Sequence, residues 1–147
     1  MNRALIDHLL AHSVRTGSFT LKSGRTSSWF IDAKQTVCRP DGILLVADAM
    51  LAVLPDDVTA IGGLTMGADP VAFGVAAIAA TRGRALRSFS VRKEAKDHGG
   101  GGRIAGALEP EDRVAITEDV EVPAGRENNA YIGVDACPEM ALTIVED

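Results

Sequence analysis

The segment VTAIGGLTMGADPVAFGVAAIAATRGRALRSFSV, residues 58–91, decides the fold class. An apolar strand at 58–61 leads into a glycine-rich loop, and an Asp-Pro pair at 69–70 supplies a helix N-cap and a proline for the first helical turn. The helix should end at Gly83, and a second apolar strand should span 85–91. Strand, helix and strand in this order predict a parallel βαβ unit. We therefore expect an α/β fold with a central parallel sheet flanked by helices.

Other elements are expected on both sides of this unit. Residues 2–15 carry a rough apolar stripe at helical spacing, which predicts a helix that Gly17 would cap. From Pro40 to about Leu54 the apolar positions keep helical spacing again, with the proline in the first turn. The remaining expectations are a short strand at 18–21, a turn at 22–25, an extended segment at 28–37, a long polar loop at 92–106 and a strand at 113–117.

Composition limits the class of protein. The chain has 147 residues, of which 46% are hydrophobic, so we expect one globular domain. A net charge of −5 argues against a nucleic-acid binder, and no apolar run is long enough to cross a membrane. The N-terminus is too polar for a signal peptide, which favours a cytoplasmic protein. Cys38 and Cys137 could pair with each other, but a reducing cytosol favours two free thiols.

Positive charge is concentrated in one glycine-containing region. Residues 82–103 hold seven Lys or Arg side chains in an otherwise acidic protein. This pattern fits either a small-anion site or a solvated basic loop. The glycine loop at 62–67 fits either close approach to a ligand or a tight turn. Glu118 and Asp119, after the expected last strand, fit either sugar or Mg²⁺ binding or an ordinary strand end. His8 and His12 are four residues apart, and we interpret them as a surface pair on a helix.

Three motifs carry a family resemblance. FTLKSGRTS at 19–27, FID at 30–32 and RKEAKDHG at 92–99 occur in the order seen in orotate phosphoribosyltransferases. The sequence from about Gly17 to Asp119 resembles that family. The resemblance implies a type I phosphoribosyltransferase fold: a hood at about 1–37, a core at about 38–119 and an atypical tail at 120–147.

The resemblance also implies a reaction and a set of site residues. Orotate and 5-phosphoribosyl 1-diphosphate would give orotidine 5′-monophosphate and pyrophosphate, with Mg²⁺ as cofactor and a homodimer as the working unit. No residue is assigned as a metal ligand. Lys96 and His98, on a mobile loop that acts across the dimer interface, would be catalytic. The substrate-binding residues would be Lys22, Trp29 and Phe30 in the hood, the donor-binding cations Arg92 and Lys93, and Glu118 and Asp119 at the ribose hydroxyls.

The sequence departs from the family pattern after Asp119. Family members place a hydroxyl- and glycine-rich turn there, and its backbone N–H groups bind the 5′-phosphate. This chain has VEVPAGRE at 120–127, in which Pro123 has no N–H and Glu121 adds negative charge. Only Gly125 and Arg126 can partly compensate. Gene rearrangement and divergence both explain the change. The alternative function is therefore a catalytically weak or inactive paralogue that binds ligand or forms dimers. A phosphoribosyltransferase for another base is disfavoured by the motif at 92–99.

Overall fold

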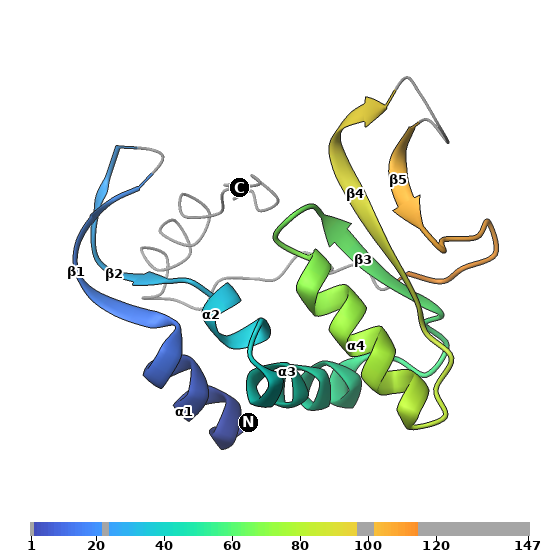
Figure 1. Cartoon of the computed structure of the whole chain (residues 1–147), viewed down its shortest axis with the longest axis horizontal. Helices are drawn as coiled ribbons and strands as arrows, with labels where there is room; N and C mark the ends of the chain where they lie inside the picture. The colour runs from blue at the N-terminus through green and yellow to red at the C-terminus, as the bar shows by residue number, and fades with distance from the viewer. Residues whose placement is uncertain (1, 22–23, 97–101, 115–147) are drawn as a thin grey trace, which may run out of the picture. The chain divides into compact units, whose positions relative to one another are not determined.

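A computed structural model describes residues 2–21, 24–96 and 102–114 (Figure 1). Backbone contacts divide the described residues into a larger unit, 2–13 and 32–114, and a smaller unit, 14–31.

The larger unit contains a mixed sheet in the order β3-β4-β5. Strand β3 (Ala60–Leu64) pairs in parallel with β4 (Arg87–Lys96), which confirms the predicted βαβ unit. Strand β5 (Gly102–Gly106) pairs with β4 in the antiparallel direction. On the other side of β3, Val114 forms a parallel bridge with Ala60.

The prediction of a long polar loop at 92–106 was wrong for the residues that the structure describes. Arg92 to Lys96 continue strand β4, and the sequence beyond the glycine run returns as β5. Val91 lies opposite Ile104, and Ser90 lies opposite Ala105. Ladder hydrogen bonds with a neighbouring strand can outweigh a polar composition, because strand preference depends strongly on the partner strand.

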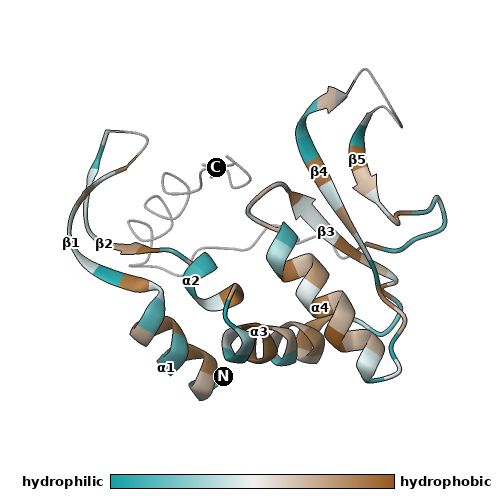
Figure 2. Cartoon of the chain, viewed as in Figure 1, coloured by the Kyte–Doolittle hydropathy of each residue, from teal (hydrophilic) through white to brown (hydrophobic). Residues whose placement is uncertain are grey.

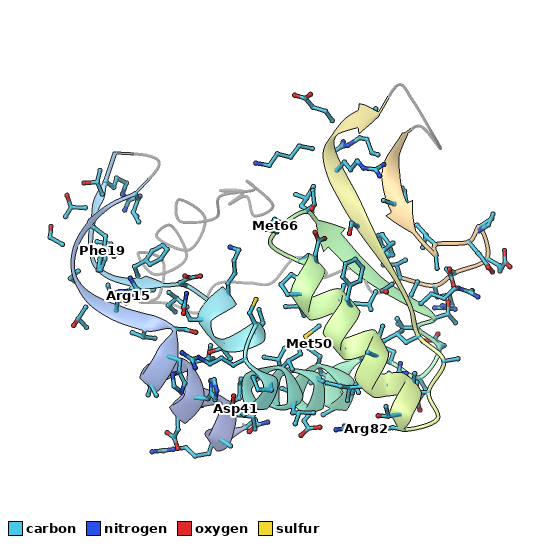
Figure 3. The ribbon with its side chains drawn as sticks, in the orientation of Figure 1. Arg15, Phe19, Asp41, Met50, Met66 and Arg82 are labelled. Atoms are coloured by element: carbon cyan, nitrogen blue, oxygen red, sulfur yellow. The ribbon has the colours of Figure 1, made fainter. Side chains whose placement is uncertain are left out.

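Two helices form the core of the larger unit with the sheet. Helix α4 (Asp69–Thr81) connects β3 to β4 and contacts both strands, and helix α3 (Pro40–Val53) packs against α4. Figure 2 shows apolar residues along both helices. Met50 of α3, labelled in Figure 3, packs against this core. The buried residues of the core cluster are Ala47, Val58, Val75, Ala79 and Leu86.

The first and third helices are separated by elements that differ from the prediction. Helix α1 (Arg3–His12) has Asn2 as its N-cap and ends at Ser13, so Gly17 is not its C-cap. The chain leaves the helix four residues earlier because Val14 already pairs with Ile31 in a β-hairpin. The extended segment expected at 28–37 is half helical, since α2 (Lys34–Val37) begins after it.

The smaller unit is an antiparallel hairpin of β1 (Val14–Thr20) and β2 (Thr26–Ile31). At its tip the Leu21 N–H donates to the Arg25 carbonyl over 2.8 Å, and Gly24 has a φ of +84°, which favours glycine. These contacts agree with the predicted turn, although Lys22 and Ser23 lie outside the described residues. Figure 3 labels Arg15 and Phe19 on β1.

A charged cluster holds residues 109–113 to the start of the sheet. The Arg87 guanidinium donates to both oxygens of Asp112, whose side chain is fully buried. Thr59 Oγ1 donates to Asp112 Oδ1 over 2.7 Å, and Glu109 forms an ion pair with Arg87. The hydrogen bonds from Arg87, and then that from Thr59, hold the pKa of Asp112 well below its usual range.

The structure bears on two further expectations, the absence of a membrane-spanning helix and the state of the cysteines. Within residues 2–21, 24–96 and 102–114, none of the helices has the length and apolar character that crossing a membrane requires. Cys38 is an exposed free thiol. Cys137 lies outside the described residues.

Candidate functional site

The candidate site begins where the two parallel strands end. Leu64 at the end of β3 pairs with Val91, and the Thr65 N–H donates to the Val91 carbonyl over 2.9 Å. The chain then turns through residues 65–68 into helix α4, while β4 continues into Arg92. Open α/β sheets bind ligands at the carboxyl ends of their parallel strands. The fold thus brings together the turn after β3 and the first residues of the basic motif.

Asp69 ties this turn to the neighbouring strand. Its carboxylate accepts a hydrogen bond from Thr65 Oγ1 over 2.6 Å and another from Ser90 Oγ over 2.8 Å. The prediction that Asp69 is the N-cap was wrong, because Ala68 occupies that position without a side-chain cap and Asp69 is the first residue of α4. A carboxylate in the first helical turn still interacts favourably with the helix dipole. Asp69 therefore stabilises both the helix start and the turn before it.

The glycines of the motif are explained by packing in two cases. A Cβ at Gly62 would lie 2.4 Å from the Phe89 carbonyl oxygen. A Cβ at Gly63 would lie 2.7 Å from the Cβ of Ala68. Both glycines belong to β3, so the loop starts later than the sequence predicted. The turn itself carries Met66, whose side chain is exposed (Figure 3), and the Thr65–Met66 peptide bond is cis.

The basic motif starts on this edge of the sheet. Arg92 is half-buried, and its carbonyl accepts a hydrogen bond from Arg103 Nε of β5 over 2.9 Å. Lys93 is exposed, and Lys96 is the last residue of β4. His98 lies outside the described residues. Of the predicted donor-binding cations, the structure therefore places Arg92 and Lys93 beside the turn that follows β3.

The predicted hood residues lie in the hairpin of the smaller unit. Trp29 pairs with Thr16, and Phe30 pairs with Arg15. The Phe30 ring packs on Phe19 with a centroid distance of 5.8 Å. Consecutive strand residues point to opposite faces, so the side chains of Trp29 and Phe30 cannot both face one ligand. Lys22, at the hairpin tip, lies outside the described residues.

The acidic pair Glu118 and Asp119 also lies outside the described residues. Val114, the last residue described, runs parallel to β3. Across the described parts of the chain, no three His, Cys, Asp or Glu side chains gather closely enough to hold a metal ion. The His8 and His12 rings lie close, with centroids 4.4 Å apart and planes tilted by 50°, but no third ligand joins them among those residues. The interpretation as a surface pair was wrong for His8, whose side chain is only 8% exposed.

Known proteins resemble the chain in sequence. No protein-family model matches it. The orotate phosphoribosyltransferase of Aquifex aeolicus is 39% identical over 128 residues, which cover 86% of this chain and 68% of that protein. That of Streptomyces avermitilis is 36% identical over 143 residues, which cover 97% of this chain and 77% of that protein. This chain belongs to the orotate phosphoribosyltransferase family.

Solved structures of orotate phosphoribosyltransferases agree with the fold. The crystal structure of the Mycobacterium tuberculosis enzyme in complex with Fe(III) dicitrate aligns with a TM-score of 0.62 and 34% identity, covering 77% of this chain and 63% of that one. A phosphoribosyltransferase from Corynebacterium diphtheriae aligns with a TM-score of 0.60 and 27% identity, covering 77% of this chain and 61% of that one. The expected type I phosphoribosyltransferase fold is confirmed, with a mixed rather than wholly parallel sheet.

The match covers only part of the length of some relatives. The Nostoc orotate phosphoribosyltransferase is 39% identical over 121 residues, which cover 82% of this chain but only 59% of that protein. The chain thus spans about three fifths of the length of this relative.

Proposed function

We propose that this chain transfers the 5-phosphoribosyl group from 5-phosphoribosyl 1-diphosphate to orotate, giving orotidine 5′-monophosphate and pyrophosphate. The observation that carries the proposal is the position of Arg92 and Lys93 on β4, directly after the end of its parallel pairing with β3 and next to the turn that leads into α4. Membership of the orotate phosphoribosyltransferase family supports the choice of substrates.

On the donor side, the basic motif would bind pyrophosphate. Arg92 and Lys93 lie on β4 just beyond its parallel pairing with β3, and Lys96 and His98 follow them along the chain. When the bond between C1 of the ribose and the pyrophosphate oxygen breaks, the leaving group gains negative charge. Cations held in place before the reaction stabilise that charge without reorganising. We assign Lys96 and His98 to catalysis, and Arg92 and Lys93 to donor binding.

The ribose would be held by Glu118 and Asp119. The parallel direction of the chain at Val114 supports this assignment, because parallel strands end at the same edge of a sheet. Carboxylates can accept hydrogen bonds from two sugar hydroxyls and also favour Mg²⁺. The proposed cofactor is Mg²⁺, bound chiefly through the oxygen atoms of the donor, since such sites commonly use substrate phosphates together with one or two carboxylates. Its chemistry is to neutralise charge on the departing pyrophosphate.

The hairpin would bind orotate through Lys22 and through the positions of Trp29 and Phe30, where one aromatic side chain faces the ring and the other residue contributes only its backbone, since the two side chains point to opposite faces of the strand. Orotate can attack C1 as its ring-nitrogen anion, so the reaction needs no strong base from the protein. We also propose a homodimer, in which Lys96 and His98 of one protomer serve the site of its partner.

The tail decides between full and weak activity. The match to the Streptomyces avermitilis relative covers 97% of the chain, so it continues beyond Asp119 into residues 120–147. In this proposal Gly125 and Arg126 replace part of the usual 5′-phosphate turn.

The test is a spectrophotometric assay of orotate consumption with 5-phosphoribosyl 1-diphosphate and Mg²⁺. Lys96→Ala should lower kcat by about a hundredfold to a thousandfold, as removal of one transition-state donor does in other enzymes. Arg3→Ala, which removes an exposed cation from α1, is the control and should leave the rate unchanged. Calorimetric binding of 5-phosphoribosyl 1-diphosphate without turnover would instead identify the inactive, ligand-binding paralogue.

A further inference from the structure

A buried chain of polar side chains joins the first two helices. Ser13 and Thr36 are both fully buried, and their hydroxyl oxygens are 2.6 Å apart. Thr36 Oγ1 is also 3.2 Å from His8 Nδ1. His8 and Ser13 belong to α1 and its C-cap, whereas Thr36 belongs to α2. Buried polar groups usually have hydrogen-bond partners, so the contacts of Thr36 with Ser13 and His8 fix α1 against α2.

The Ser13 end of this chain lies at the base of the β-hairpin. Ser13 immediately precedes β1, and Asp32 immediately follows β2. The Asp32 N–H donates to the Ser13 carbonyl over 2.9 Å, and the Ser13 N–H donates to the Leu9 carbonyl over 2.8 Å. The two residues from which the hairpin leaves the larger unit are therefore hydrogen-bonded to each other, and one of them is anchored through its side chain to Thr36.

The His8 end lies close to helix α3. His8 Nε2 is 3.3 Å from Asp41 Oδ2, in the first turn of α3 (Figure 3), which is an ion-pair distance, and the His12 ring lies 4.4 Å from the His8 ring, tilted by 50°. A Cβ at Gly42 would lie 2.9 Å from His8 Cε1 and 2.1 Å from the Thr36 carbonyl oxygen. Glycine at this position therefore allows α3 to approach both residues closely.

Thr36 is the central member of the chain. A hydroxyl can donate one hydrogen bond and accept two, so Thr36 Oγ1 can serve Ser13 Oγ and His8 Nδ1 at the same time. Loss of this hydroxyl would remove a partner from Ser13 Oγ and from His8 Nδ1 at once. A single substitution can thus release the side-chain anchor at the base of the hairpin.

We propose that Thr36 and His8 are positioning residues that fix Ser13 and Asp32, the two joints of the hairpin, and so restrict the hinge motion of the strand that carries Trp29 and Phe30. The consequence for orotate binding rests on the proposed function. The restriction of motion does not depend on it.

The sequence provides a direct probe, because Trp29 is the only tryptophan. Time-resolved anisotropy of its fluorescence, measured without ligands, reports motion of the hairpin on the nanosecond timescale. Thr36→Val keeps the shape and removes the hydroxyl, and Thr36→Ser keeps the hydroxyl. Thr36→Val should show a larger fast component of anisotropy decay than wild type, and Thr36→Ser should resemble wild type. Equal decays in folded wild type and Thr36→Val would overturn the proposal.

Two further measurements cover the remaining outcomes. If Thr36→Val does not fold, Ser13→Ala removes the hydroxyl that Thr36 contacts and should give the same larger fast component of anisotropy decay. An unchanged decay in folded Ser13→Ala would also refute the proposed restriction of hairpin motion. In the assay of orotate consumption, Thr36→Val should raise KM for orotate by about fivefold to tenfold, the value of one hydrogen bond, with a smaller change in kcat. A changed anisotropy with an unchanged KM would keep the anchor but exclude the hairpin from orotate binding.

Discussion

Replacement of Asp69 tests whether the turn after β3 is held for ligand binding. Asp69→Ala removes the acceptor of two hydrogen bonds, from Thr65 Oγ1 and from Ser90 Oγ. Ser90 is only 9% exposed, so its hydroxyl would lose a partner in a place that water reaches poorly. Thr65 is half-buried and can partly replace its bond with water.

The expected cost follows from these two bonds. A hydrogen bond to a charged group contributes roughly 1.5–3 kcal/mol. Because Thr65 can recover part of its bond, we expect Asp69→Ala to cost about 3 kcal/mol of unfolding free energy, which for a domain of this size is roughly 10 °C in Tm. Asp69→Asn keeps a side-chain oxygen as acceptor and should cost less, about 1–2 kcal/mol.

The assay is denaturant unfolding followed by circular dichroism, with and without 5-phosphoribosyl 1-diphosphate. Asp69→Ala should lose most of the stabilisation that the ligand gives to wild type, and Asp69→Asn should keep most of it. Asp7→Ala, which removes an exposed carboxylate from α1, is the control. In a Ser90→Ala background the cost of Asp69→Ala should fall to about half, because the buried hydroxyl is already gone. An unfolding free energy for Asp69→Ala within about 0.5 kcal/mol of wild type would refute the reasoning.

Three further predictions concern the stability of the larger unit. Gly74→Ala should destabilise wild type by about 1 kcal/mol, because the new Cβ would lie 2.4 Å from Ile43 Cδ1. In the Ile43→Ala variant, which lacks that atom, Gly74→Ala should stabilise the protein by a similar amount, and an equal effect of Gly74→Ala on the unfolding free energy in both backgrounds would contradict this. The pKa of Asp112 is lowered chiefly by Arg87, so this carboxylate contributes stability that is present above its unfolded pKa and lost as pH falls. Asp112→Asn should therefore lose less unfolding free energy than wild type below about pH 4, and acid titrations of the two proteins by circular dichroism with parallel unfolding curves would oppose this. Val75→Ala, at a fully buried position, should cost about 2–3 kcal/mol in urea unfolding, and a cost below about 1 kcal/mol would show that the core can collapse around the gap.

Local signals were sufficient for the two longest helices. Regular apolar spacing and Pro40 predicted a helix to about Leu54, and the structure has α3 at Pro40–Val53. Gly83 was expected to end α4, and it follows the C-cap Arg82 with a φ of +77°. Such elements are predictable because many adjacent residues favour the same period and the ends carry their own residue preferences.

Contacts between distant residues could not be predicted in the same way. The end of α1 at Ser13 depends on pairing between Val14 and Ile31, and the strand character of 92–96 depends on β5. The ion pair of Arg87 with Asp112 joins residues 25 apart in the sequence. Nothing in the local sequence specifies these partners, because strand preference and ion pairing depend on what the fold brings near.

The candidate site contains residues that the local sequence predicted and a contact that it could not predict. The motif at 92–99 predicted Arg92 and Lys93 as donor-binding residues, and in the structure they follow Val91 on β4, where the parallel pairing with β3 ends. The role of Asp69 was missed, because the Asp-Pro pair was interpreted as a cap. Its spacing of four residues from Thr65 gave a local signal for one contact, but Ser90 comes from the neighbouring strand.

The position of the basic motif has an electrostatic consequence for the sheet. Arg92 is on β4, and Arg103 of the adjacent strand β5 donates to its carbonyl. Like charges that lie close on neighbouring strands repel, and a bound pyrophosphate group would replace that repulsion by attraction to a common anion. The proposed donor site would therefore account for cations on two neighbouring strands of a protein with a net charge of −5, because the bound anion stabilises an arrangement that costs free energy without it.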